Sequence, residues 1–246
     1  MDYVVAIPSY RRADVLAVST LPMLLERGVP IDRIYVFVGT DQEIVDYHSG
    51  LPVGTQVVKG APGMAGNRNA IARYFPDGAA VCQFDDDITD VRRLVDAKTT
   101  APVMDLDGFI QTAFEATADA GLSMWGVYPT LNPFWMSQRV TFGLRFLVGC
   151  MWGVFNRQAE QLVLDEKEDY ERTLRRWSAD GGVVRFDYVA PKNRTYKTPG
   201  GCQASHDRIA RSADSAAYLM AQYPGLVALN PRRKGAHTEI LLKEPK

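Results

Sequence analysis

Three consecutive carboxylates, Asp85, Asp86 and Asp87, follow directly on an apolar run that ends at Phe84. Adjacent like charges repel one another, and each is costly unless a cation or hydrogen-bond donors offset it. Mg²⁺ and Mn²⁺ prefer carboxylate oxygens and commonly share their remaining positions with phosphate and water. The triplet therefore indicates a divalent-metal site that can also meet a diphosphate. The alternative is a solvated acidic turn that caps a following helix, with Asp87 or Thr89 as N-cap.

Two other polar segments add to this pattern. Residues 8–11 end the first apolar run of the chain, which is where a nucleotide base would rest. Gly63, Gly66 and Arg68 stand at the start of an amphipathic stretch. Glycines at a helix start allow close approach to the backbone, and free amides with an arginine favour an anion. These segments indicate a nucleotide or diphosphate site, although Arg68 by itself could equally form a structural ion pair.

The elements that must position these residues are read from the hydrophobic pattern. Short apolar runs alternate with amphipathic stretches, which is typical of βα units that feed a mostly parallel sheet. We expect strands at Tyr3–Ile7, Ile34–Val38, Gln56–Val58 and Ala79–Phe84. We expect helices at Asp14–Glu26, Asp41–His48 and Gly66–Tyr74. Ligands of open α/β sheets bind at the carboxyl ends of strands, so the acidic triplet is placed where chemistry is expected.

The second half of the chain has a different pattern. The expected helices are Leu106–Ala120, Glu168–Trp177 and Ser215–Tyr223. The expected strands are Met124–Tyr128, antiparallel strands within Gln138–Phe155, and Val183–Val189. Pro191–Ser205 is long, polar and glycine-containing, so it is a candidate lid or binding loop. The predicted fold class is α/β: one domain over residues 1–246, with a mostly parallel Rossmann-like sheet and antiparallel strands in the C-terminal half.

The order of the motifs carries more information than any one of them. A strand followed by PSYRR, then GMAGNRN opening a helix, then a strand followed by FDDD occur within roughly the first ninety residues. This layout resembles that of the GT-A glycosyltransferases. The resemblance implies a GT-A-like fold in an enzyme that transfers a hexose from a nucleotide sugar. It also implies a nucleotide-sugar-binding half over residues 1–98 and an acceptor-binding half over residues 99–246.

The same resemblance implies roles for individual residues. Asp87 resembles the main metal ligand of the family's DxD motif, Asp85 a residue that contacts the metal and the ribose or donor sugar, and Asp86 a supporting residue. His237 resembles a further metal ligand near the C-terminus, and Lys234 beside it would hold the diphosphate. The residues implied to bind the nucleotide sugar are Pro8, Ser9, Tyr10, Arg11, Gly66, Arg68, Asp85, Asp86 and Lys234. The implied metal is Mn²⁺ or Mg²⁺, and the implied donor is a UDP sugar, with UDP-glucose favoured.

Glu168 and Asp169 open the polar helix and resemble the family's xED motif, whose acidic residue is the base in inverting members. A general base must reach the acceptor hydroxyl within hydrogen-bond distance. Asp169 is the first candidate for this role and Glu168 the second. Acidic residues are also favoured at helix N-termini for electrostatic reasons alone. A retaining mechanism would not need this base.

Three segments of the second half resemble the TET-associated glycosyltransferases of phages. They are residues 168–175, residues 180–186, and residues 190–192 leading to Gly200 and Gly201. That family is associated with adding sugars to hydroxymethylated pyrimidines in DNA. The resemblance therefore implies a DNA acceptor, with 5-hydroxymethylcytosine as the leading candidate.

Basic residues flank the candidate base and the following loop, as a path for a phosphate backbone requires. They are Arg172, Arg175, Arg176, Arg185, Lys192, Arg194 and Lys197. Trp177, Tyr188 and Tyr196 could stack on a displaced base. The arginines of the helix could instead pair with its own acidic residues.

The distribution of charge agrees with a basic C-terminal third. Residues 1–170 carry 14 Lys and Arg against 22 Asp and Glu, whereas residues 171–246 carry 14 against 7. Such an asymmetry is typical of a surface that meets a polyanion, and it also arises by chance on a well-solvated surface.

Composition excludes several classes of protein. The chain is 46% hydrophobic and 23% charged, as in ordinary globular proteins, and it contains no apolar run long enough to span a membrane. Its three cysteines are widely spaced without a CxxC or Cys/His cluster, so neither a disulfide framework nor a zinc site is indicated. We expect a cytoplasmic protein without a signal peptide, in the host cytoplasm if a phage encodes it.

Three rival functions remain. One is a GT-A glycosyltransferase that acts on a polysaccharide, a protein or a small molecule. Another is a nucleotidyltransferase, although such enzymes usually carry a glycine-rich basic loop where this chain has Pro8–Arg11. The third is a non-catalytic DNA-binding module on a GT-A scaffold, which predicts no donor hydrolysis and no metal dependence.

Overall fold

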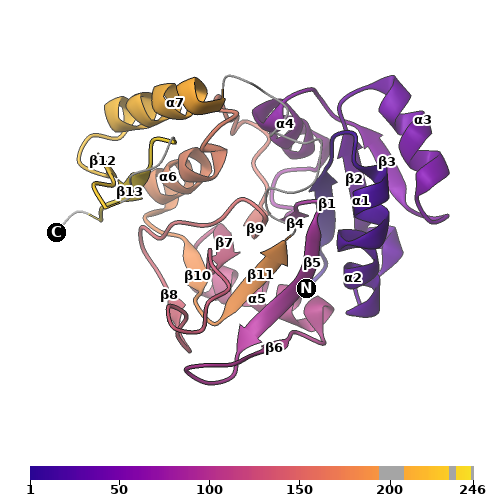
Figure 1. Ribbon diagram of the computed structural model, residues 1–246, viewed down its shortest axis with the longest axis horizontal. Helices are drawn as coiled ribbons and strands as arrows, with labels where there is room; N and C mark the ends of the chain where they lie inside the picture. Colours follow the sequence, from indigo (N-terminus) through magenta and orange to yellow (C-terminus); the bar gives the residue numbers. More distant parts are fainter. Residues whose placement is uncertain (194–207, 233–236, 245–246) are drawn as a thin grey trace.

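The computed structural model describes residues 1–193, 208–232 and 237–244. Its main layer is an eight-stranded sheet with the strand order β3-β2-β1-β4-β9-β7-β10-β8 (Figure 1). The strands of this sheet are β1 (Val4–Pro8), β2 (Ile34–Val38), β3 (Gln56–Lys59), β4 (Ala80–Phe84), β7 (Met124–Val127), β8 (Val140–Thr141), β9 (Met151–Phe155) and β10 (Val184–Phe186).

The sheet is parallel in its first half and mixed in its second. β1 pairs in parallel with β2 and β4, and β2 pairs in parallel with β3. β9 lies antiparallel between β4 and β7, while β8 lies antiparallel to β10. The expected fold class, a mostly parallel α/β sheet with antiparallel strands in the C-terminal half, is confirmed.

Two small antiparallel sheets accompany the main one. The first has the order β11-β5-β6 and contains β5 (Ile88–Leu94), β6 (Thr100–Pro102) and β11 (Val189–Asn193). The second pairs β12 (Val227–Leu229) with β13 (Ile240–Leu242). The first sheet matters most for the site, because β5 begins one residue after the acidic triplet.

Helices flank the sheet at both ends of the molecule. They are α1 (Ala13–Val18), α2 (Thr20–Glu26), α3 (Asp41–Gly50), α4 (Met64–Tyr74), α5 (Leu106–Asp119), α6 (Glu168–Asp180) and α7 (Arg208–Gln222), with a 3-10 turn at Ile31–Arg33. Figure 1 shows α6 and α7 at the end opposite α1, α2 and α3. Leu174 of α6 packs in one apolar cluster with Ala216 and Leu219 of α7.

The central strands carry the core. Every residue of β4 is buried, as are four of the five residues of β1 and of β2. Strands covered on both faces read as continuous apolar runs, which is why they could be predicted from the sequence. Their carboxyl ends deliver Ser9 and Asp85 to the same edge of the sheet, because β1 and β4 are adjacent and parallel.

The predicted helix Asp14–Glu26 is instead two helices that meet at Ser19, whose φ of −127° and ψ of −94° are not helical. Pro22 explains the break, because its ring has no N–H to donate and clashes with the carbonyl four residues earlier in a continuous helix. The break places Thr20 at the start of α2. Its hydroxyl donates to the carbonyl of Asp85 at 2.7 Å and accepts from the Ile88 amide at 2.8 Å.

The alternative in which the acidic triplet caps a helix is wrong, since the strand β5 follows. Ile88, Val91 and Leu94 are buried at a spacing that also suits a helix. Pairing with β11 on one side and β6 on the other decides the outcome, because strand preference depends strongly on such tertiary contacts.

Other boundaries also differ from expectation. The expected strand Val183–Val189 is divided between β10 and β11, which belong to different sheets. Within Gln138–Phe155 only β8 and β9 are strands. The C-terminal helix begins at Arg208 rather than Ser215. Most of the expected lid Pro191–Ser205 lies outside the described residues. Among the helices that are described, none is long and apolar enough to cross a membrane.

Replacing Thr20 with valine is expected to destabilise the protein by about 2–4 kcal/mol, because it leaves the buried Asp85 carbonyl and Ile88 amide without their partner. Thr55→Val is the matched control, since the buried Thr55 hydroxyl makes no hydrogen bond. Urea unfolding of both variants measures the difference. Equal stability of the two variants would contradict the role given to Thr20.

Candidate functional site

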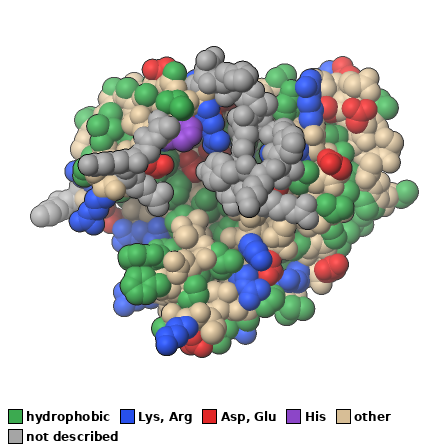
Figure 2. Space-filling view, in the orientation of Figure 1, with side chains coloured by type: hydrophobic (Ala, Val, Ile, Leu, Met, Phe, Trp, Pro, Cys, Tyr) green, Lys and Arg blue, Asp and Glu red, His purple; other side chains and the backbone are tan. Residues whose placement is uncertain are grey.

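A cleft of about 690 Å³ opens at the carboxyl ends of β1 and β4. Its wall is formed by the end of β1, the start of α4, the acidic triplet, residues 148–150, residues 165–170 and the start of α7. Figure 2 shows acidic side chains in a hollow of this face, with Lys or Arg side chains beside them. The cleft therefore brings together motifs that lie far apart in the sequence.

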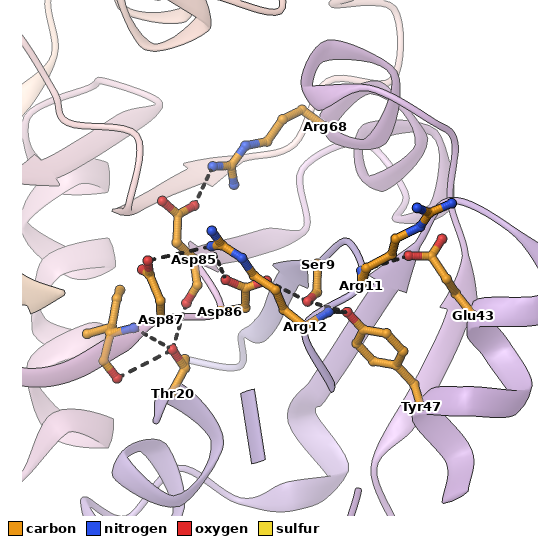
Figure 3. Close-up of polar contacts among 11 residues, drawn as sticks. Ser9, Arg11, Arg12, Thr20, Glu43, Tyr47, Arg68, Asp85, Asp86 and Asp87 are labelled. Atoms are coloured by element: carbon orange, nitrogen blue, oxygen red, sulfur yellow. Dashed lines mark hydrogen bonds and ion pairs between the residues drawn. The ribbon is translucent and has the colours of Figure 1, made fainter. Parts of the chain in front are cut away.

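A chain of hydrogen bonds ties the end of β1 to the acidic triplet (Figure 3). The Ser9 hydroxyl donates to Asp86 Oδ2 at 2.6 Å and lies 2.6 Å from the Tyr47 hydroxyl, which in turn accepts from the Arg12 amide at 2.9 Å. Since Ser9 donates its proton to Asp86, Tyr47 donates to Ser9. Burial raises the pKa of Tyr47 to about 12, so it remains a donor.

The turn after β1 adopts an uncommon conformation. Arg11 has a φ of +53°, which non-glycine residues rarely adopt. Glu43 holds it there, accepting from the Arg11 amide at 2.9 Å and from the Gly39 amide at 3.1 Å. The Arg11 guanidinium lies over the Tyr10 ring at 5.0 Å, and Tyr10 is exposed. Pro8, Ser9 and Tyr10 line the cleft, whereas Arg11 does not.

Arg12 joins the second and third carboxylates of the triplet. Its Nη1 lies 3.3 Å from Asp86 Oδ1 and 3.6 Å from Asp87 Oδ2. Burial raises the pKa of Asp86, and the contacts from Ser9 and Arg12 act in the opposite direction. Asp86 therefore stabilises the turn after β1 through its contacts with Ser9 and Arg12, which suits the supporting role expected for it. Arg12 was not among the residues predicted for the site.

Asp85 is paired with the buried Arg68. Arg68 Nη2 lies 3.0 Å from Asp85 Oδ1 and donates to the carbonyl of Gly149 at 2.9 Å. Its Nη1 donates to Gln83 Oε1 at 2.7 Å. The pKa of Asp85 is raised to about 7, chiefly by burial and further by the neighbouring carboxylates, against the lowering effect of Arg68. Arg68 lines the cleft, but its side chain is buried and both of its Nη atoms are already hydrogen-bonded within the protein.

A second buried arginine lies behind Glu168. The Arg172 guanidinium sits over the Trp152 ring at 3.8 Å from its centroid, and Arg68 lies over the same ring at 5.6 Å. Arg172 Nη1 is 3.5 Å from Glu168 Oε1, and Arg68 Nε is 3.7 Å from the same oxygen. Glu168 is thus held between two guanidiniums. Burial lowers the pKa of Arg172 to about 10.

Asp169 has a different environment from Glu168. The pKa of Asp169 is raised to about 7, first by burial and then by Glu168, while Arg172 and the Tyr170 amide act in the opposite direction. Its Oδ1 accepts from that amide at 2.9 Å. Neighbouring carboxylates in unlike surroundings are typical of sites where one group anchors and the other exchanges a proton. Of the two expected candidates, Asp169 suits the base and Glu168 the anchor.

The charges of the cleft fit a divalent cation. Seven carboxylates line the cleft, those of Asp85, Asp86, Asp87, Asp165, Glu166, Glu168 and Asp169. They face five cationic side chains, those of Arg12, Arg68, Lys167, Arg208 and Arg211, which leaves a formal charge of −2 when all are ionised. The described residues contain no ready-made group of three metal-binding side chains. Mg²⁺ is usually held by one or two carboxylates together with substrate phosphates rather than by an all-protein cage, so Asp85 and Asp87 suffice.

The expected anion site at the start of α4 needs correction. Asp165 accepts from the Ala65 amide at 2.9 Å, so a carboxylate of the protein itself caps this helix. Asn69 fixes the same loop by exchanging hydrogen bonds with the Leu162 backbone at 2.7 and 2.8 Å. Gly66 does not line the cleft. The start of α4 thus anchors the loop that leads into α6.

Two arginines of α7, Arg208 and Arg211, line the cleft and were missed by sequence reasoning. Both lie near Glu166, with Arg208 Nε 3.3 Å and Arg211 Nη2 3.7 Å from its Oε1. Their spacing of three residues, which places both on one helix face, was the available signal. The sequence pattern predicted a helix only from Ser215, so Arg208 and Arg211 were not expected to lie on a helix.

The basic residues expected along a DNA path do not share one surface. Arg172 and Arg176 are buried, and Arg176 pairs with Glu160 at 2.6 Å, so the expectation that they contact DNA is corrected. Arg175 pairs with Glu171 at 2.7 Å, and Arg185 pairs with Asp187 at 2.6 Å. Lys192 is exposed on β11. The pairs Arg172–Glu168 and Arg175–Glu171 match the alternative in which the helix arginines pair with acidic residues of the same helix, whereas Glu160 lies outside it.

The remaining expected residues are only partly described. His237 is exposed and does not line the cleft. Trp177 packs against the cluster between α6 and α7, and Tyr188 packs edge-on against Phe186. Lys234, Arg194, Tyr196 and Lys197 lie outside the described residues.

Neither a protein-family model nor a curated protein sequence matches the chain. Solved structures match its fold. S. aureus TarS 1-349 in complex with UDP aligns with a TM-score of 0.51 and 15% identity, over 89% of this chain and 66% of that one. The mannosyltransferase PcManGT from Pyrobaculum calidifontis, in complex with GDP-Man and Mn²⁺, aligns with a TM-score of 0.51 and 16% identity, over 89% and 63%. The fold is therefore GT-A-like, and the chain spans about two thirds of the length of these structures.

Replacing Asp169 with asparagine is expected to stabilise the metal-free protein more at pH 8 than at pH 5. The pKa of Asp169 is about 7 in the folded protein, above the value of about 4 in an unfolded chain. The folded state therefore binds the proton more tightly, and the stability contributed by Asp169 falls as pH rises from about 4 to 7. Asparagine keeps the acceptor for the Tyr170 amide and removes the charge. Urea unfolding at both pH values measures the gain.

Asp96→Asn is the control with opposite sign, because hydrogen bonds from Thr99 and Lys98 lower the pKa of this exposed carboxyl. A gain for Asp169→Asn that is equal at the two pH values, or a loss at pH 8, would contradict the environment described for Asp169.

Proposed function

We propose that this protein is a metal-dependent glycosyltransferase that uses a nucleoside diphosphate sugar. The observation that carries the proposal is the acidic cleft with a formal charge of −2, built at the carboxyl ends of β1 and β4 and joined by Glu168 and Asp169. The GT-A-like fold supports it, as do the ligands of the two structural neighbours, which are UDP for one and GDP-Man with Mn²⁺ for the other.

In this proposal the first half of the chain, residues 1–98, binds the donor. Pro8, Ser9 and Tyr10 line the part of the cleft next to β1, and exposed Tyr10 offers a ring on which a base can stack. Residues 99–246 bind the acceptor and supply Glu168 and Asp169. The cleft takes its wall from both halves, so the reacting groups meet between them.

Asp85 and Asp87 hold the divalent cation, Mn²⁺ or Mg²⁺. When bound, the cation offsets the negative charge that develops on the departing diphosphate. Arg12 and Arg68 keep the two carboxylates in place from either side, at 3.6 Å and 3.0 Å respectively. His237 could become a further metal ligand only if its position changed, because it is exposed and does not line the cleft.

Asp169 acts as the general base for the acceptor hydroxyl. It lines the cleft, and its raised pKa of about 7 suits proton transfer near neutral pH. Glu168 keeps its place between Arg68 and Arg172 and thereby fixes the start of α6. A base in this position corresponds to an inverting transfer, in which the acceptor oxygen attacks the sugar carbon as Asp169 takes its proton.

The identity of donor and acceptor rests on the sequence resemblance. It favours UDP-glucose as donor and 5-hydroxymethylcytosine in DNA as acceptor. Of the described basic residues expected to meet DNA, Arg175, Arg185 and Lys192 are not buried. A polysaccharide, protein or small-molecule acceptor is the second candidate, and the experiment below separates the two.

Incubation of the protein with Mn²⁺ or Mg²⁺, a panel of UDP and GDP sugars, and duplexes with cytosine or 5-hydroxymethylcytosine is the direct test. Intact-mass measurement is expected to show a hexose gain on the modified duplex only. Nucleoside diphosphate release without a gain in DNA mass supports a glycosyltransferase with another acceptor. No donor turnover with either metal would refute the proposal and favour a non-catalytic DNA-binding module.

Replacing Asp87 with asparagine is expected to lower donor turnover at least about 100-fold, because it removes a charged ligand of the cation. Turnover is measured as nucleoside diphosphate release at saturating Mn²⁺. Asp96→Asn, on an exposed turn away from the cleft, is the matched control and is expected to keep full turnover. Near-normal turnover of the Asp87 variant would exclude Asp87 as a metal ligand.

Asp169→Asn is expected to lower kcat by about 10²–10⁴-fold while leaving the donor's Kd unchanged, because it removes the base without touching the donor. The rate of the unmodified protein should rise between pH 6 and 8, as Asp169 loses its proton, and the residual rate of the variant should not. Donor titration by calorimetry and initial rates across pH measure both effects. A normal kcat for the variant would show that Asp169 is not the general base.

A further inference from the structure

The first turn of α7 brings two guanidiniums into the cleft. Arg208 and Arg211 lie three residues apart on one helix face and both line the cavity. Their side chains are 30% and 39% exposed, so they are accessible from the cleft and are not part of the core. α7 is fixed to the rest of the molecule by Ala216 and Leu219, which pack against Leu174 of α6.

One carboxylate serves both guanidiniums. Glu166 Oε1 lies 3.3 Å from Arg208 Nε and 3.7 Å from Arg211 Nη2. Lys167 follows Glu166 and lines the cleft as well. Together with Asp165, which precedes Glu166 and also lines the cleft, these side chains carry three positive charges and two negative charges. The part of the cleft next to α7 is therefore basic, whereas the part next to the triplet is acidic.

The neighbouring groups that were expected to bind an anion are already occupied. The start of α4 is capped by Asp165, and Arg68 is buried against Asp85, Gln83 and Gly149. Arg12 also lines the cleft, but it is paired with Asp86 and Asp87. The described cations of the cleft wall that are not paired with the triplet are therefore Arg208, Arg211 and Lys167.

We infer that Arg208 and Arg211 bind the diphosphate of the sugar nucleotide, a role that rests on the proposed function. Guanidiniums donate paired hydrogen bonds to phosphate oxygens, so two of them on one helix face can hold adjacent phosphoryl groups. Glu166 keeps the pair oriented before the nucleotide arrives. Because both arginines belong to α7, binding of the diphosphate also couples α7 to the acidic part of the cleft.

Calorimetric titration with UDP, UMP and uridine, and with the guanine series, in the presence of Mn²⁺ tests this role without requiring turnover. The double variant Arg208→Ala/Arg211→Ala is expected to bind the nucleoside diphosphate about 10- to 100-fold more weakly, from the loss of charged hydrogen bonds. Its affinity for the nucleoside should be unchanged. The double lysine variant should recover part of the loss, because it keeps the charge without the paired geometry.

Arg145→Ala is the matched control, since Arg145 is 37% exposed and pairs with Glu244 at 3.3 Å away from the cleft wall. Thermal unfolding of all variants establishes that they are folded. If the unmodified protein binds neither UDP nor GDP, the proposed function and this inference both fail. If it binds one of them and the double alanine variant binds that ligand equally well, only the role of Arg208 and Arg211 is overturned.

Discussion

Repulsion among the carboxylates of the cleft is the constraint on which the rest of the site depends. Seven line the cleft, five of them in the triplet and at Glu168 and Asp169, and burial is the largest cause of the raised pKa of about 7 at both Asp85 and Asp169. Each of the three compensating arginines comes from a different element, Arg12 from the turn before α1, Arg68 from α4 and Arg172 from α6. The need to offset these charges therefore ties the two halves of the chain together at one point of the sheet.

Arg172 shows what this arrangement costs. Its guanidinium is buried, its nitrogens make no hydrogen bond to any residue that the structure describes, and its charge is compensated by the Trp152 ring and by Glu168. Buried charges without hydrogen bonds are unfavourable for folding, and sites of this kind are kept where they orient a reacting group. Gly149 makes the packing feasible, because a Cβ there would lie 3.1 Å from Glu168 Oε1. Burying Arg172 therefore lowers the stability of the folded protein, and in return its ion pair with Glu168 fixes the start of α6.

The sequence predicted those parts that depend on local pattern. The strands β1, β2 and β4 are largely apolar runs, so their positions, the acidic triplet at their edge and the α/β class followed directly. The rest depends on contacts between distant residues. Pairing with β11 made Ile88–Leu94 a strand. The ion pair between Arg12 and Asp86 could not be predicted, because the two residues are far apart in the sequence and form no recognisable motif. Arg172 and Arg176 look like surface residues in a polar helix, yet Glu168 and Glu160 draw them inward.

The division of the cleft into an acidic and a basic part implies that, in the proposed enzyme, cation and diphosphate bind cooperatively. The acidic part offers Asp85 and Asp87 to a cation but leaves most of its coordination positions to other oxygens. The basic part offers Arg208 and Arg211, but Glu166 already shares them, which weakens their attraction for a free anion. Each ligand therefore supplies what the other lacks. A diphosphate completes the coordination of the cation, and the cation offsets the phosphate charge that faces the carboxylates. Neither part of the cleft alone holds its ligand as well as the two parts hold both.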